Sequence, residues 1–110
     1  MAICTLALIS GHSTFSNASA TVLRLFKGSD YFGYTTVVPP DFGRVEPGVP
    51  PNPTAISFAT FSDAAIQAGL SRLYGGIHFS DDNSVGQNLG AQIGSQAYSR
   101  AQDYFQGRQP

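Results

Sequence analysis

An arginine, a histidine and an aspartate stand close together in the second half of the chain. His78 follows Arg72 by six residues, and Asp82 follows the histidine by four. Arginine is a permanent cation whose planar fork suits tetrahedral oxyanions, and histidine serves as a nucleophile, an acid–base group or a metal ligand. A carboxylate one helical turn further on can hold the far ring nitrogen and fix the tautomer. The spacing therefore predicts an anion or metal site.

Each of these residues also has an ordinary structural interpretation, as a surface cation, a hydrogen-bonded core histidine and a helix cap. A second stretch far upstream, Ser10-Gly11-His12, favours chemistry. It lies in a loop before a predicted helix, where free backbone N–H groups attract anions. Ser10 adds a hydroxyl donor and His12 adds a second imidazole. Together the two stretches predict an oxyanion pocket with two imidazoles.

Hydrophobic spacing predicts three helices that would position these residues. The first starts at Ser13 or Thr14 and ends at Lys27. The second opens at Ser62-Asp63 and ends at Gly75-Gly76, and the third starts at Asp82 or Asn83 and runs to about residue 105. The first helix has an expected buried face of five apolar residues, Phe15, Ala18, Val22, Leu25 and Phe26, opposite a face of small polar residues.

Three glycines recur every fourth residue in the third helix, at Gly86, Gly90 and Gly94. Glycine inside a helix costs about 1 kcal/mol relative to alanine, so a stripe of three indicates close approach of another backbone. We expect that backbone to come from helices outside this chain.

The connector between the first two helices is long and rich in proline, especially over residues 47–53. Residues 33–38 have the β-branched and aromatic content of a short strand, and residues 54–61 alternate as a partner strand would. The predicted fold class is mainly α: a partial helical bundle of about three helices with a long proline-rich loop and a short β-ribbon.

Composition excludes several classes of protein. The 110 residues carry a net charge of −1 and no basic cluster, so no nucleic-acid partner is expected. Cys4 is the only cysteine, which excludes an internal disulfide and a cysteine-based zinc site. No apolar run is long enough for a transmembrane segment. The first nine residues make no convincing signal peptide, and localisation is not predicted.

The pairing of Ser10-Gly11-His12 with Ser71-Arg72, His78 and Asp82 resembles the second and third signature motifs of the superfamily of vanadium-dependent haloperoxidases and type 2 phosphatidic-acid phosphatases. The sequence segments SGHSTFS and FSDAAIQAGLSRLYGGIHF are most similar to the bacterial haloperoxidase branch. The resemblance covers nearly the whole chain and implies an all-α bundle with the site between helices. Members are often secreted or periplasmic.

The resemblance also implies a role for each matching residue. His78 would bond the vanadium of vanadate, and Arg72, Ser10 and Gly11 would hold the oxygens, with phosphate as an analogue. His12 and His78 would be catalytic, and Asp82 would orient His78. The partners implied are hydrogen peroxide and a halide or organic substrate, with vanadate acting as a Lewis acid on bound peroxide.

One motif of the family is absent from this chain. The family's first motif is a lysine and an arginine-proline pair on an earlier helix, whereas the only lysine here, Lys27, lies downstream of Ser10. We therefore expect residues 1–110 to be a single domain that forms the C-terminal part of a larger haloperoxidase-like domain, packed against further helices or another chain. Whether the chain is an enzyme by itself is left open.

Three alternatives remain beside haloperoxidase activity. The same residues could hydrolyse phosphomonoesters or lipid phosphates, or the chain could be a remnant that binds phosphate or only packs as a subunit. A zinc or iron site made of His12, His78 and Asp82 is a weaker idea, since Arg72 nearby favours an anion over a cation.

Overall fold

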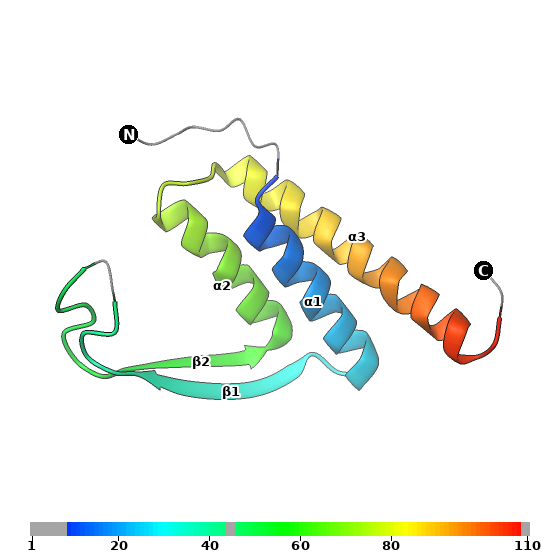
Figure 1. Cartoon of the computed structure of the whole chain (residues 1–110), viewed down its shortest axis with the longest axis horizontal. Coiled ribbons are helices and arrows are strands. Elements are labelled where there is room, and N and C mark those ends of the chain that lie inside the picture. The colour runs from blue at the N-terminus through cyan, green and yellow to red at the C-terminus, as the bar shows by residue number, and fades with distance from the viewer. Residues whose placement is uncertain (1–8, 44–45, 109–110) are drawn as a thin grey trace.

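The computed structural model describes residues 9–43 and 46–108. Five elements follow one another: α1 (Gly11–Lys27), β1 (Tyr31–Val38), β2 (Thr54–Thr60), α2 (Phe61–Tyr74) and α3 (Ser80–Phe105) (Figure 1). The predicted mainly α fold of three helices with a small β-ribbon is confirmed. None of the helices in the described ranges is both long enough and apolar enough to cross a membrane.

The helices lie side by side in a single layer, with α1 between α2 and α3 (Figure 1). The molecule measures 54 × 35 × 18 Å. Because one helix with its side chains is about 10–12 Å across, the shortest dimension holds little more than one layer. Domains normally bury their apolar faces between two or three layers. Accordingly, Ala20 and Ala65 are the only buried apolar residues among those described.

The glycine stripe of α3 receives the backbone of α1. A Cβ atom at Gly94 would lie 2.5 Å from the carbonyl oxygen of Ala18, and one at Gly90 would overlap the carbonyl oxygen of Thr14. The predicted close approach of a backbone is therefore confirmed. The expectation that this backbone comes from outside the chain is wrong, because α1 itself fills the stripe.

The buried face of α1 differs from the one predicted from its apolar residues, of which Ala18, Val22 and Leu25 are half-buried and none is buried. Its buried residues are Ser13, Ala20 and Thr21, while Phe15 is 77% exposed and Phe26 is 78% exposed. The glycines of α3 explain this difference, since they bring the two backbones so close that only small side chains fit between them. The aromatic side chains must then point away from the layer.

All three helices begin earlier than predicted, and α3 begins at Ser80, after the N-cap Phe79. α1 begins after the N-cap Ser10, whose Oγ accepts a hydrogen bond from the N–H of Ser13 at 3.3 Å. α2 begins after the N-cap Thr60, whose Oγ1 accepts from the N–H of Asp63 at 2.9 Å. Ser62, the predicted cap, lies inside the helix. In α1 and α2, a hydroxyl residue two to four positions upstream of the predicted one caps the helix by the same chemistry.

The two strands pair antiparallel, as predicted, although β1 starts two residues before the predicted position. The register is irregular between Tyr31 and Tyr34. Within this irregularity Phe32 packs on Phe61, with ring centroids 4.9 Å apart. The backbone N–H of Phe61 also donates to the carbonyl of Asp30 at 3.0 Å. These contacts attach the ribbon to the start of α2, at the end of the layer opposite the candidate site (Figure 1).

Candidate functional site

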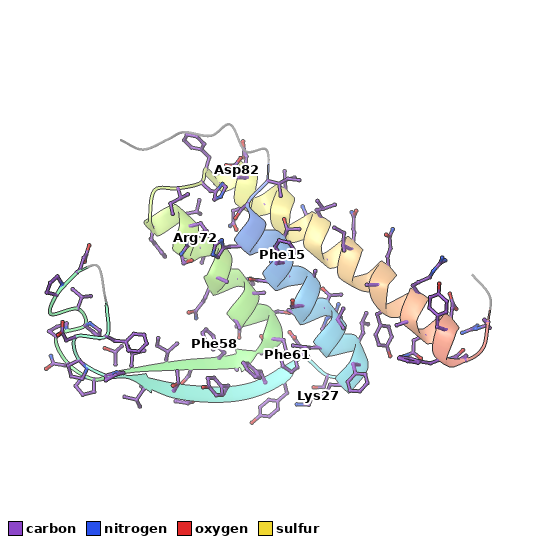
Figure 2. All side chains as sticks on the ribbon, in the orientation of Figure 1. Phe15, Lys27, Phe58, Phe61, Arg72 and Asp82 are labelled. Atoms are coloured by element: carbon purple, nitrogen blue, oxygen red, sulfur yellow. The ribbon has the colours of Figure 1, made fainter. Side chains whose placement is uncertain are left out.

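Three helix ends meet at one end of the layer: the beginning of α1, the end of α2 and the beginning of α3 (Figure 1). Figure 2 shows Arg72 from α2 and Asp82 from α3 at this end, while Lys27 lies at the other end of α1. The starts of α1 and α3 both direct the positive ends of their dipoles towards the site. The arrangement therefore brings together the two sequence stretches predicted to form a pocket.

The turn that follows α2 places the histidine. Ile77 N–H donates to the carbonyl of Arg72 and Gly76 N–H donates to the carbonyl of Leu73, both at 3.0 Å. Gly76 has a φ of 68°, which glycine adopts without strain. Together these are the two bonds of a Schellman motif. The predicted glycine stop is confirmed, and the motif carries the chain from α2 to His78 within a few residues.

His78 is paired with Asp82, as its spacing predicted. His78 Nδ1 lies 3.2 Å from Asp82 Oδ2, and each side chain is 14% exposed. His78 precedes α3 rather than lying on it, and Asp82 also accepts a bond from the N–H of Phe79 at 3.3 Å, which caps α3. A carboxylate at Nδ1 favours the tautomer that carries its proton there. Nε2 is then the nitrogen with a free lone pair.

Ser10 joins the upstream motif directly to this pair. Its backbone N–H donates to the carbonyl of Asp82 at 3.1 Å, and its side chain is fully buried. The Ser10 hydroxyl oxygen accepts from the backbone of Ser13, so its own proton stays available for another acceptor. Gly11 and His12 form the exposed first turn of α1, where backbone N–H groups have no acceptor within the helix.

Arg72 supplies the positive charge at the site. It lies in the last turn of α2, half-buried, and its Nε donates to the hydroxyl of Ser71 at 3.0 Å. Ser71 in turn donates to the carbonyl of Ala68 at 2.7 Å. Within residues 9–43 and 46–108 the arginine makes no ion pair, so its charge is not neutralised by a carboxylate of that part.

The sequence predicted Ser13 and Asn83 only as helix caps, but in the structure their side chains bond to each other across two helices. Ser13 Oγ donates to Asn83 Oδ1 at 2.5 Å, and both residues are buried. The signal that could have found Ser13 is the face of small polar residues on α1. Such a face suits a glycine stripe on a neighbouring helix better than an aromatic face does.

The structure also tests the predicted metal site. The described residues contain no group of three histidine, cysteine or acidic side chains arranged to hold a metal ion, so the prediction of a zinc or iron site from His12, His78 and Asp82 is wrong.

The ammonium of Lys27 donates to the carbonyl of Tyr31 at 2.6 Å. Lys27 therefore takes no part in the site, as its sequence position indicated.

Comparison with known proteins identifies the family. The sequence family described as the VCPO second helical-bundle domain matches residues 7–107. The chain belongs to this family. It is thus a member of the haloperoxidase superfamily and corresponds to the C-terminal portion of such proteins, as the paired motifs indicated.

Two solved structures agree with this assignment to the VCPO family. They are the apo-type and holo-type bacterial vanadium-dependent chloroperoxidases, with TM-scores of 0.81 and 0.80. Both are 28% identical to this chain and cover 86% of it. The chain spans only about a fifth of their length, 21% and 20%. No curated protein matches the sequence.

Proposed function

We propose that this chain supplies one half of a vanadate site in a vanadium-dependent haloperoxidase, an enzyme that oxidises halide with hydrogen peroxide. The observation that carries the proposal is the pairing of His78 with Asp82 at 3.2 Å, joined to the Ser10 motif by a backbone hydrogen bond at 3.1 Å. Both similar chloroperoxidases are vanadium-dependent, which supports vanadate as the cofactor.

The residues at the three helix ends fit a tetrahedral oxyanion by their chemistry. The available groups are two donors, the Gly11 N–H and the Ser10 hydroxyl, one cation, the Arg72 guanidinium, and one ligand atom, the Nε2 of His78 with its free lone pair. A helix N-terminus favours an anion, and a guanidinium fork matches its oxygens. Phosphate, the analogue of vanadate, would use the same donors.

Each residue would have one role when the anion is bound. Vanadate would supply a Lewis acid that polarises peroxide for attack by halide. Arg72, Ser10 and Gly11 would hold its oxygens, and His78 Nε2 would bond to vanadium. Asp82 would keep His78 in the required tautomer. His12, exposed on the first turn of α1, would transfer protons to and from peroxide.

The site needs more positive charge than this chain places there. Charge-assisted hydrogen bonds contribute about 1.5–3 kcal/mol each. Among the described residues, Arg72 is the only lysine or arginine in the last turn of α2 and the first turns of α1 and α3. We therefore propose that residues 1–110 form the C-terminal part of a larger haloperoxidase-like domain. Further cations would come from the remaining four fifths of a protein of the relatives' length.

The outer face of α1 and α3 is where further helices would pack. An apolar groove of about 410 Å³ runs between the two helices, lined by Val22, Leu23, Ile93 and small residues. It continues into a second groove of about 290 Å³ beside Phe26 and Phe105. Helices of the same protein are the proposed occupant, because this chain spans only about a fifth of the length of each similar chloroperoxidase.

Vanadate binding and bromide- or chloride-dependent peroxidase activity of the intact protein test the proposal. We expect His78→Ala and Arg72→Met to abolish vanadate binding and turnover. Arg100→Met is a matched control, because Arg100 is an exposed arginine of α3 that lies 5.7 Å from the ring of Tyr104, remote from the site. This variant should retain both properties.

Two outcomes would contradict the haloperoxidase assignment. Hydrolysis of phosphate esters without halide oxidation would indicate a phosphatase that uses the same residues. No turnover and no vanadate binding with both histidines intact would indicate a domain that only packs as a subunit.

A further inference from the structure

We propose that Ser13 and Asn83 are positioning residues that hold the Ser10-Gly11-His12 motif and the His78–Asp82 pair in register. Neither residue is among the predicted ligands or catalytic groups. Their hydrogen bond joins the first turn of α1 to the first turn of α3. The inference rests on the proposed function, because the register matters for a shared anion.

The bond between the two side chains is short and enclosed. Ser13 Oγ donates to Asn83 Oδ1 at 2.5 Å; Ser13 is 0% exposed and Asn83 is 7% exposed. Gln87 Nε2 donates to the same oxygen at 3.3 Å. A buried polar group that loses its partner keeps its full desolvation cost, so removing either side chain strongly disfavours this arrangement.

The Ser13–Asn83 hydrogen bond lies next to proposed site residues in the sequence of both helices. Ser13 follows His12 directly and Asn83 follows Asp82 directly. The backbone bond from Ser10 to Asp82 lies beside it, at 3.1 Å. These two bonds come from positions three residues apart on α1. Together with the packing of α1 on the glycine stripe, they fix how the first turns of α1 and α3 meet.

Helix α2 packs against the same hydrogen bond. A Cβ atom at Gly69 of α2 would lie 2.8 Å from Ser13 Oγ and would overlap Asn83 Oδ1. The α2 backbone therefore packs directly against the Ser13–Asn83 pair. Arg72 follows Gly69 by three residues, so this contact also sets where the guanidinium meets the other two motifs.

A buried residue on the same helix interface provides the control. Thr21 is 7% exposed and packs against Gly94, where a Cβ would lie 2.9 Å from its own Cβ. It lies eight residues beyond Ser13 along α1, away from the site. Thr21→Ala removes a buried hydroxyl from the α1–α3 interface, as Ser13→Ala does. It leaves the Ser13–Asn83 hydrogen bond, which we call the junction, intact.

The experiment compares Ser13→Ala, Asn83→Ala, the double variant and Thr21→Ala in the intact protein. Each single junction variant should weaken vanadate binding by about tenfold, which matches the loss of one buried hydrogen bond. The double variant should be little worse than either single one, because the two residues share one interaction. Thr21→Ala should lower the unfolding temperature to a similar degree while changing vanadate affinity by less than about twofold.

A readout without ligand separates this inference from the proposed function. The ¹⁵N ring signals of His78 should shift in Ser13→Ala, although Ser13 belongs to another helix, and should stay in place in Thr21→Ala. If the unaltered protein binds no vanadate, the proposed function fails, and the ring signals still decide whether the junction aligns the histidine. Unchanged ring signals in Ser13→Ala, or equal effects of Thr21→Ala, would overturn the positioning role.

Discussion

Replacing Gly94 of α3 by alanine tests the close approach of the α1 backbone to α3 at a position away from the site. The added Cβ would lie 2.5 Å from the Ala18 carbonyl oxygen and 2.9 Å from Thr21 Cβ. A relaxed carbon–oxygen contact is about 3.3–3.6 Å, so α1 must move away by about 1 Å. Neither obstacle is the far end of a flexible side chain, so a rotamer change cannot absorb the overlap.

Two opposing terms set the size of the effect. Overpacking of this kind costs about 1–3 kcal/mol. Alanine recovers about 1 kcal/mol over glycine in a helix interior. Because the backbone of α1 has to shift, we expect the cost to lie in the upper part of its range. The net loss in the free energy of unfolding should be about 1–2 kcal/mol.

Urea or thermal unfolding of the intact protein, followed by circular dichroism, measures this loss. Ser95→Ala is the matched control, since Ser95 is the next residue on α3 and is exposed. That variant should be neutral or slightly stabilising. If Gly94→Ala stabilised the protein by about 1 kcal/mol, helix propensity alone would be acting, and the close approach of α1 would be refuted.

Three further predictions concern the caps and the charges. Thr60→Ala should lower the free energy of unfolding by about 1 kcal/mol through loss of the α2 cap, whereas Ser62→Ala should change it little, as equilibrium unfolding would show. Asp82→Asn keeps an oxygen that can accept from the N–H of Phe79 but removes the carboxylate charge that faces His78 Nδ1. Vanadate affinity should therefore fall about 10–100-fold while stability changes little; equal affinity would contradict the orienting role. Lys27→Met should leave vanadate affinity unchanged, because the lysine is bonded at the far end of α1; a loss measured by the same titration would show that it reaches the site.

The existence of the elements could be predicted because each has a strong local signal. Period and stop residues gave the three helices, and the alternation in residues 54–61 gave the strand that pairs with β1. The pairing of His78 with Asp82 could also be predicted from spacing. The histidine lies outside the helix, but the cap at Phe79 brings the carboxylate back towards it.

The orientation of α1 could not be predicted from its own residues. The rule that an apolar face points inward assumes that the buried partner has room for large side chains. Gly90 and Gly94 remove that room, so the small face of α1 packs inward and Phe15 points outward. The outcome depends on a residue pattern about seventy positions away, which a helix-by-helix interpretation does not combine.

The exposed aromatic face and the shortage of cations have one physical explanation. Because Ala20 and Ala65 are the only buried apolar residues of the described ranges, the layer of helices lacks a core on its outer side. The proposed site for a multiply charged anion lacks positive charge, since Arg72 is the only lysine or arginine that the described residues place at the three helix ends. On our proposal, further helices of a longer haloperoxidase would cover the groove beside Phe26 and bring the additional cations with them. The junction of Ser13 and Asn83 holds this half of the site in register independently of that second half, because all of its partners lie within α1, α2 and α3.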